Sequence, residues 1–186
     1  MARQKILFVS HCILNISSKV VMWEYEDMAA EEDLRKRFLM KAIPQDIQLV
    51  QLPCPEFTMY GARRWGHVSD QFDNVFFRNH CRKILEPVLD QMEEYLSEPD
   101  RFEVLGVAGV DGSPSCGVDL TCESKEYYGS LGGHPDPLKV FSSIEMTNKN
   151  GVLISVLKEM MAERGIEIPV KGLFAPEPEK VMSFLE

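Results

Sequence analysis

Residues 104–117 read VLGVAGVDGSPSCG, and this stretch decides the fold. Its first five residues form a short apolar run bounded by glycine and proline, which is typical of a strand covered on both faces. The glycines and the proline that follow allow backbone angles that a regular strand cannot adopt. The stretch therefore predicts a buried strand that ends in a loop presenting the thiol of Cys116.

Two earlier stretches repeat this pattern of an apolar run followed by a cysteine. ILFV at 6–9 leads through Ser10 and His11 to Cys12, and IQLVQL at 47–52 leads through Pro53 to Cys54. In an open parallel α/β sheet, ligands bind outside the carboxyl ends of the strands. We therefore expect the thiols of Cys12, Cys54 and Cys116 to converge there, although they lie far apart in sequence.

Helical patterns separate the predicted strands. Residues 26–42 are rich in strong helix formers, and residues 70–96 carry apolar residues at three- and four-residue steps. Pro87 falls inside the second helix and is expected to kink or split it, because proline removes a helical donor. Cys81 lies on or beside the apolar face of this helix, which predicts a thiol packed in the core.

The last part of the chain predicts one more strand and two helices. Residues 151–164 return to helical spacing, with Asn148 or Asn150 as the expected N-cap. A fourth short strand is predicted at 170–174, and a terminal helix is predicted to run as far as Leu185.

These elements predict the α/β fold class, because a helix between two strands favours parallel pairing. We expect one Rossmann-like three-layer domain over residues 1–186, with a short, mostly parallel sheet of about four strands. The cysteine-bearing loops would lie at the carboxyl ends of the strands. Residues 118–148 show no sustained period, which is typical of a functional lid, and they are placed to close over the site.

Composition limits the partners. The formal net charge of −9 argues against direct nucleic-acid binding, which depends on lysine and arginine neutralising phosphates. Arg63 and Arg64 form either a local basic pocket or a solvated pair. The apolar run at 6–9 is too short for a signal peptide or a membrane span, so we expect a cytoplasmic protein without a membrane partner. Five cysteines are an odd number and favour reduced thiols over a disulfide framework.

Three converging thiolates suggest an iron-sulfur centre. A cubane cluster is normally held by four cysteines, so three leave one iron with an exchangeable position. Such an iron is a Lewis acid, much as a catalytic zinc keeps an open position. Structural zinc modules usually pair their ligands within a few residues, and no CxxC motif occurs here. The site would instead be assembled by the fold.

Three motifs in the right order resemble those of the thiouracil desulfurase family, once known only as a domain of unknown function. They are Cys12-Ile13-Leu14, Cys54-Pro55-Glu56 and the SPSCG motif at 113–117, within a match of roughly residues 5 to 120. The resemblance implies that Cys12, Cys54 and Cys116 bind a 4Fe-4S cluster whose fourth iron takes the sulfur of a thiolated pyrimidine.

This chain departs from the family pattern at three places. Residues 15–18 and 111–112 replace stretches that usually contain basic residues, and residues 61–64 only loosely match the usual glycine-rich segment that ends in arginine. The resemblance therefore implies a divergent desulfidase for a small thiolated molecule that the sequence does not identify.

The residues around the thiols suggest a route that needs no net redox step. A thiocarbonyl sulfur is soft and prefers iron over hard cations, and a carboxylate can activate water to attack the carbon. Glu56 is the first choice as base or proton shuttle, although it could instead cap backbone donors. Asp111, Ser113 and Ser115 would orient water or substrate, or serve only the turn. Strand alternation would point His11 to the face opposite Cys12, so we expect it to pack in the core or to support the ligands rather than to act as a ligand.

Two other readings stay open at this point. Cys122 or a histidine could act as a fourth ligand of a cluster or of zinc, which would make the protein a non-catalytic sensor or an electron-transfer protein. Alternatively, Cys116 could be a nucleophile activated by a histidine in a metal-free enzyme.

Overall fold

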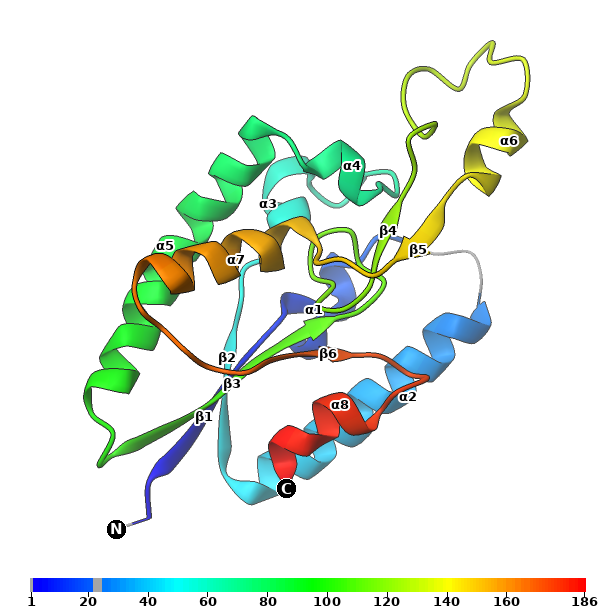
Figure 1. Cartoon of the computed structure of the whole chain (residues 1–186). Helices are drawn as coiled ribbons and strands as arrows, with labels where there is room; N and C mark the ends of the chain where they lie inside the picture. The colour runs from blue at the N-terminus through cyan, green and yellow to red at the C-terminus, as the bar shows by residue number, and fades with distance from the viewer. Residues whose placement is uncertain (1, 22–24) are drawn as a thin grey trace.

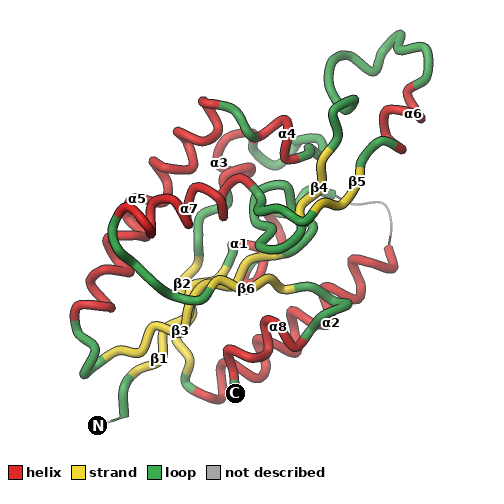
Figure 2. The backbone as a smooth tube through the Cα atoms, in the orientation of Figure 1, coloured by secondary structure: helices red, strands yellow, loops and turns green. Residues whose placement is uncertain are grey.

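Four parallel strands form the central sheet of the protein. The computed structural model describes residues 2–21 and 25–186. The strand order is β2-β1-β3-β6, and each neighbouring pair is parallel (Figure 2). The strands are β1 (Gln4–Val9), β2 (Ile47–Gln51), β3 (Phe102–Val110) and β6 (Val170–Leu173). The prediction of a short, mostly parallel sheet of about four strands is confirmed.

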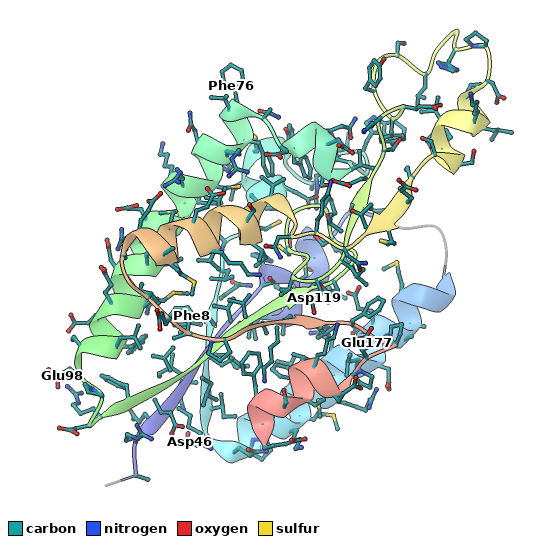
Figure 3. All side chains as sticks on the ribbon, viewed as in Figure 1. Phe8, Asp46, Phe76, Glu98, Asp119 and Glu177 are labelled. Carbon is teal, nitrogen blue, oxygen red and sulfur yellow. The ribbon has the colours of Figure 1, made fainter. Side chains whose placement is uncertain are left out.

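Helices cover both faces of this sheet. In Figure 1, α5 (Val75–Ser97) and α7 (Val152–Glu163) lie on one face, and α2 (Tyr25–Ala42) and α8 (Glu179–Met182) lie on the other. The successive residues Leu7 and Phe8 of β1 are both fully buried, as expected for a strand covered on both sides. Phe8 accordingly lies in the interior in Figure 3, whereas Phe76 points outward. The architecture is a Rossmann-like three-layer α/β fold.

Short helical segments complete the connections. They are α1 (His11–Leu14), η1 (Ile16–Ser18), η2 (Ile43–Gln45), α3 (Pro55–Tyr60), α4 (Ser69–Phe72) and η3 (Ser183–Leu185). The predicted terminal helix is therefore divided into α8 and η3. None of the helices in the described ranges is both long enough and apolar enough to cross a lipid bilayer.

The helix predicted over residues 70–96 is two helices, and its break lies elsewhere than expected. Asn74 ends the connection after α4, and its side chain accepts the N–H groups of Phe76 and Phe77 at 3.0 and 3.1 Å. It is thus the N-cap of α5. Pro87 lies inside α5 without ending it, because the buried residues on both sides of it anchor the helix to the core. Cys81 is fully buried in that core, as predicted.

Residues 118–148 are not structureless, which corrects the prediction. They contain β4 (Thr121–Glu123) and β5 (Glu145–Thr147), which pair antiparallel, with α6 (Pro137–Ser142) between them. Figure 1 shows this arm, residues 121–147, projecting from the main body. Strands of three residues are too short to display an alternation, so no period is visible in the sequence.

Candidate functional site

The three predicted thiols follow three neighbouring strands. Cys12 lies in α1 after β1, Cys54 is the N-cap residue of α3 after β2, and Cys116 lies in the loop after β3. Because β1 lies between β2 and β3 and all three are parallel, their carboxyl ends share one edge of the sheet. The three loops therefore emerge side by side.

The surroundings of the three thiols raise their pKa values. Burial raises the pKa of the Cys116 thiol, and the charges of Cys12 and Cys54 raise it further. Burial also raises the pKa of Cys12 to about 11, with a further contribution from Cys54. Burial raises the pKa of Cys54 as well. All three pKa values are thus shifted in the same direction, toward the protonated thiol, with burial as the main cause.

Cys12 has a polar environment that includes His11. The hydroxyl of Ser18 lies 2.7 Å from His11 Nδ1 and 3.7 Å from Cys12 Sγ, and Ser18 is buried. The expectation that His11 points away from Cys12 rested on strand alternation. It fails because β1 ends at Val9 and His11 begins α1. His11 therefore lies beside Cys12, with the Ser18 hydroxyl between them.

Helix α3, which follows Cys54, contributes a buried carboxylate. Cys54 Sγ accepts the backbone N–H of Phe57 at 3.4 Å, which is a sulfur version of an N-cap. Glu56 Oε1 accepts a hydrogen bond from Ser115 Oγ at 2.7 Å, and Oε2 accepts one from Arg64 Nε at 3.1 Å. Glu56 thus links the Cys54 loop to the Cys116 loop.

Arg64 and Arg63 differ in a way that the sequence does not reveal. The Arg64 side chain is only 4% exposed and forms an ion pair with Glu56, whereas Arg63 is exposed. Arg64 is therefore neither part of a solvated pair nor an unoccupied basic pocket. It is a site residue that sequence reasoning missed, because two adjacent arginines carry no signal that separates them.

The two serines of the SPSCG motif have different contacts. Ser113 Oγ accepts the backbone N–H groups of Ser115 and Cys116 at 3.4 and 3.1 Å, so it stabilises the turn. Ser115 is buried, and its Oγ lies 3.6 Å from Cys116 Sγ as well as within hydrogen-bonding distance of Glu56. Ser115 therefore lies between the proposed base and one thiol.

Asp111 organises the backbone that follows Cys116. Its Oδ1 accepts the N–H groups of Val118 and Asp119 at 2.7 and 2.9 Å, and more weakly that of Leu120 at 3.3 Å. The other oxygen, Oδ2, is buried and has no hydrogen-bond partner among the described residues. These contacts hold the loop, and a role of Asp111 in orienting water or substrate stays a prediction.

Helix α7 begins on the Cys116 loop, which corrects the N-cap prediction. The N-cap residue is Gly151 rather than Asn148 or Asn150. The first helical N–H groups donate to carbonyls of the SPSCG motif: Val152 to Pro114 at 3.0 Å and Leu153 to Ser115 at 2.9 Å. These acceptors come from a distant part of the chain, so no local capping residue is needed.

Gly151 allows this close contact, and replacing it is expected to destabilise the protein. A Cβ atom at Gly151 would lie 2.6 Å from the carbonyl carbon of Ser115 and 2.9 Å from the N atom of Cys116. Because backbone must move to relieve these contacts, we expect Gly151→Ala to lower the free energy of unfolding by about 1–3 kcal/mol. Urea denaturation of the native chain and of the variant measures this difference in the free energy of unfolding. Gly66→Ala is the matched control, since a Cβ at Gly66 meets no atom within 4 Å. Equal stability of the two variants would contradict this prediction.

Cys122 lies on a different sheet from the strands that precede the other three thiols. It is on β4, and its thiol donates to the carbonyl of His67 at 3.8 Å. Burial raises its pKa to about 11, and the main charges acting on it are the carboxylates of Glu56, Glu123 and Asp70. Cys122 thus belongs to the two-stranded sheet rather than to the segments that follow β1, β2 and β3, and its role as a fourth ligand stays a prediction.

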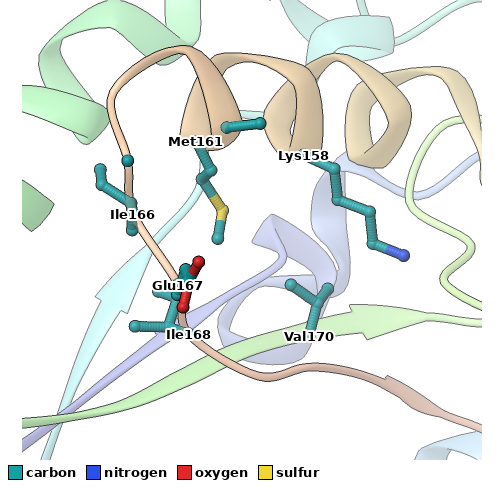
Figure 4. Close-up of a pocket in the computed structure, with 8 residues that line it drawn as sticks. Lys158, Met161, Ile166, Glu167, Ile168 and Val170 are labelled. Atoms are coloured by element: carbon teal, nitrogen blue, oxygen red, sulfur yellow. The ribbon is translucent and has the colours of Figure 1, made fainter.

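A surface pocket lies at the other end of the sheet. It is lined by Lys158 and Met161 of α7, by residues 166–168 and by Val170, the first residue of β6 (Figure 4). None of the residues predicted to bind a cofactor or to act in catalysis lines it. The thiols and the buried ion pair, rather than this pocket, define the candidate site.

Fold and site together define an α/β protein with three cysteines that follow neighbouring parallel strands and a buried Glu–Arg pair beside them. The chain is 31% identical over 118 residues to the protein named "Uncharacterized protein MJ0003" from Methanocaldococcus jannaschii, and the match covers 63% of this chain and 70% of that protein. The chain belongs to the same family as this archaeal protein. No protein-family model and no solved structure gives a significant match.

Proposed function

We propose that the protein is an iron-sulfur-dependent desulfidase. It would remove sulfur from a thiocarbonyl-type small molecule, such as a thiolated nucleobase, and release sulfide without net redox change. The observation that supports this proposal is the convergence of three thiols from three strands beside the buried carboxylate of Glu56.

Cys12, Cys54 and Cys116 would hold a 4Fe-4S cluster. Thiolates are the usual ligands of such a cluster, and with three of them the bound cluster supplies a Lewis-acidic iron with one open position. Within residues 2–21 and 25–186, no group of three or more His, Cys, Asp or Glu side chains is placed to hold a metal ion, so loading the chain with iron is the direct test of this ligand set.

Glu56 is the residue that we propose as the base. Each of its carboxylate oxygens accepts one strong hydrogen bond, from Ser115 or from Arg64. A carboxylate oxygen can accept two, so each keeps a lone pair for the proton of an attacking water. Arg64 and Ser115 fix the carboxylate in place, and burial keeps bulk water from competing for its proton.

The raised pKa values disfavour a metal-free cysteine enzyme. A nucleophilic cysteine needs a lowered pKa and a basic partner, whereas burial raises the pKa of Cys116. His11 reaches Cys12 through the hydroxyl of Ser18. Buried thiols that lose their protons only when a metal centre binds are better suited to be ligands than to be nucleophiles.

Two measurements test the proposal. The protein is purified and reconstituted without oxygen, and we expect about four irons and about four sulfides per chain. It is then incubated with thiolated pyrimidines, thiolated purines and aliphatic thioamides while released sulfide is assayed. Iron-dependent sulfide release from at least one class supports a desulfidase. A colourless protein that contains zinc, or an iron-loaded protein that releases no sulfide from any class, contradicts it.

A further inference from the structure

One buried arginine connects all three thiol-bearing loops. Arg64 Nη2 donates to the carbonyl of Ser18, in the segment after Cys12, at 2.6 Å, and Arg64 Nε donates to Glu56 at 3.1 Å. Glu56, in the segment after Cys54, accepts from Ser115, next to Cys116, at 2.7 Å. These hydrogen bonds therefore connect the three segments that carry the thiols. We call this series of residues the arginine bridge: Ser18, Arg64, Glu56 and Ser115.

The arginine bridge is shielded from solvent. The side chains of Arg64 and Glu56 are 4% and 10% exposed, so salt and water screen their interaction little. The guanidinium donates from its Nε to Glu56 and from Nη2 to Ser18, and Nη1 approaches the carbonyl of Gly61 at 3.4 Å. A planar group with donors in fixed, divergent directions makes these contacts together, whereas the single ammonium of lysine does not.

We infer that Arg64 is a positioning residue that holds the three thiol loops together before any metal binds. The loops follow three different strands, whose ends are joined by backbone bonds and by the Gln51 amide donating to the carbonyl of His11 at 3.1 Å. Beyond these bonds at the base, each loop has its own local turn. The arginine bridge links the loops to one another. The thiols therefore have fixed relative positions before a metal centre binds, and the entropy cost of ordering them is part of the folding free energy. This inference concerns the metal-free chain and does not depend on the desulfidase proposal.

The test compares two thiol reagents on the reduced, metal-free full chain. Dibromobimane becomes strongly fluorescent only after it has cross-linked two thiols, whereas iodoacetamide labels each thiol alone. A change that merely loosens the fold raises both rates, because both reactions need exposed thiols. Loss of mutual position lowers only the ratio of cross-linking to single labelling. Peptide mapping identifies which of Cys12, Cys54 and Cys116 are joined.

We expect Arg64→Met to lower this ratio about tenfold, the scale of coupling within one hydrogen-bonded network. Arg63→Met removes the same charge from the exposed neighbour and is expected to keep the native ratio. A folded Arg64→Met protein with the native ratio overturns the inference. If Arg64→Met does not fold, Ser115→Ala decides, because it cuts the arginine bridge without a change of charge. A ratio lowered about threefold or more supports the inference, and an unchanged ratio overturns it.

Discussion

Cys116→Ser is expected to abolish iron binding and to reduce sulfide release by on the order of 10³-fold or more, because a cofactor-dependent reaction keeps little rate without its cofactor. Serine is nearly the same size as cysteine but is a poor ligand for the iron of a cluster. Cys116 is only 7% exposed, so the introduced hydroxyl costs about 1–3 kcal/mol of folding stability without preventing folding. Iron content and sulfide release on the reconstituted variant are the measurements.

Cys122→Ser is the matched control for this substitution. It replaces the same sulfur atom by oxygen in a partly buried cysteine that lies on β4, in the two-stranded sheet. We expect native iron content and native sulfide release. Full iron content in Cys116→Ser would remove that residue from the site. Equal loss of iron in both variants would instead indicate a cluster closed by Cys122, as in a sensor or an electron-transfer protein.

Glu56→Gln is expected to lower sulfide release by about 10²–10⁴-fold while the chain keeps its iron, because an amide cannot take the proton of water. The glutamine keeps an oxygen that accepts from one neighbour but leaves the buried charge of Arg64 without its partner. We therefore also expect a loss of about 3–5 kcal/mol in the free energy of unfolding. Sulfide release at a temperature where the variant is folded separates the two effects.

Glu123→Gln provides the control for the removal of a carboxylate. Glu123 forms an ion pair with the exposed Lys149 at 2.8 Å, and such surface pairs contribute about 0–1 kcal/mol. We expect sulfide release and stability close to native for this variant. A Glu56→Gln protein with the native rate would show that another group takes the proton, and the role of Glu56 would then be limited to the arginine bridge.

The strands and the convergence of the thiols follow from local pattern combined with one topological rule. Each of the apolar runs before Cys12, Cys54 and Cys116 forms a strand of one parallel sheet, so the cysteines after them share an edge. The break before α5 also has a local signal, because Asn74 is a favoured N-cap residue and precedes an apolar segment. The predicted break at Pro87 is based on the proline alone and does not take Asn74 into account.

Other features depend on contacts between distant segments. The partner of Glu56 is Arg64 rather than the neighbouring Arg63, and only the folded path of residues 61–64 decides between them. The start of α7 at Gly151 depends on carbonyls of Pro114 and Ser115, which no capping rule based on neighbouring residues can find. Patterns among neighbouring residues do not indicate these contacts between distant segments.

The projecting arm has a consequence for how this protein can vary. Its two strands pair directly with each other, Thr121 with Thr147, and Thr121 is bonded to the carbonyl of Ser113 at 3.0 Å. The two ends of the arm are thus held together by strand pairing at its base. The entropy cost of lengthening a loop whose ends are held together grows only slowly with its length. Insertions, deletions or a grafted peptide at the distal part of the arm should therefore leave the thiol-bearing loops undisturbed, which makes this appendage a natural position for engineering and for evolutionary divergence.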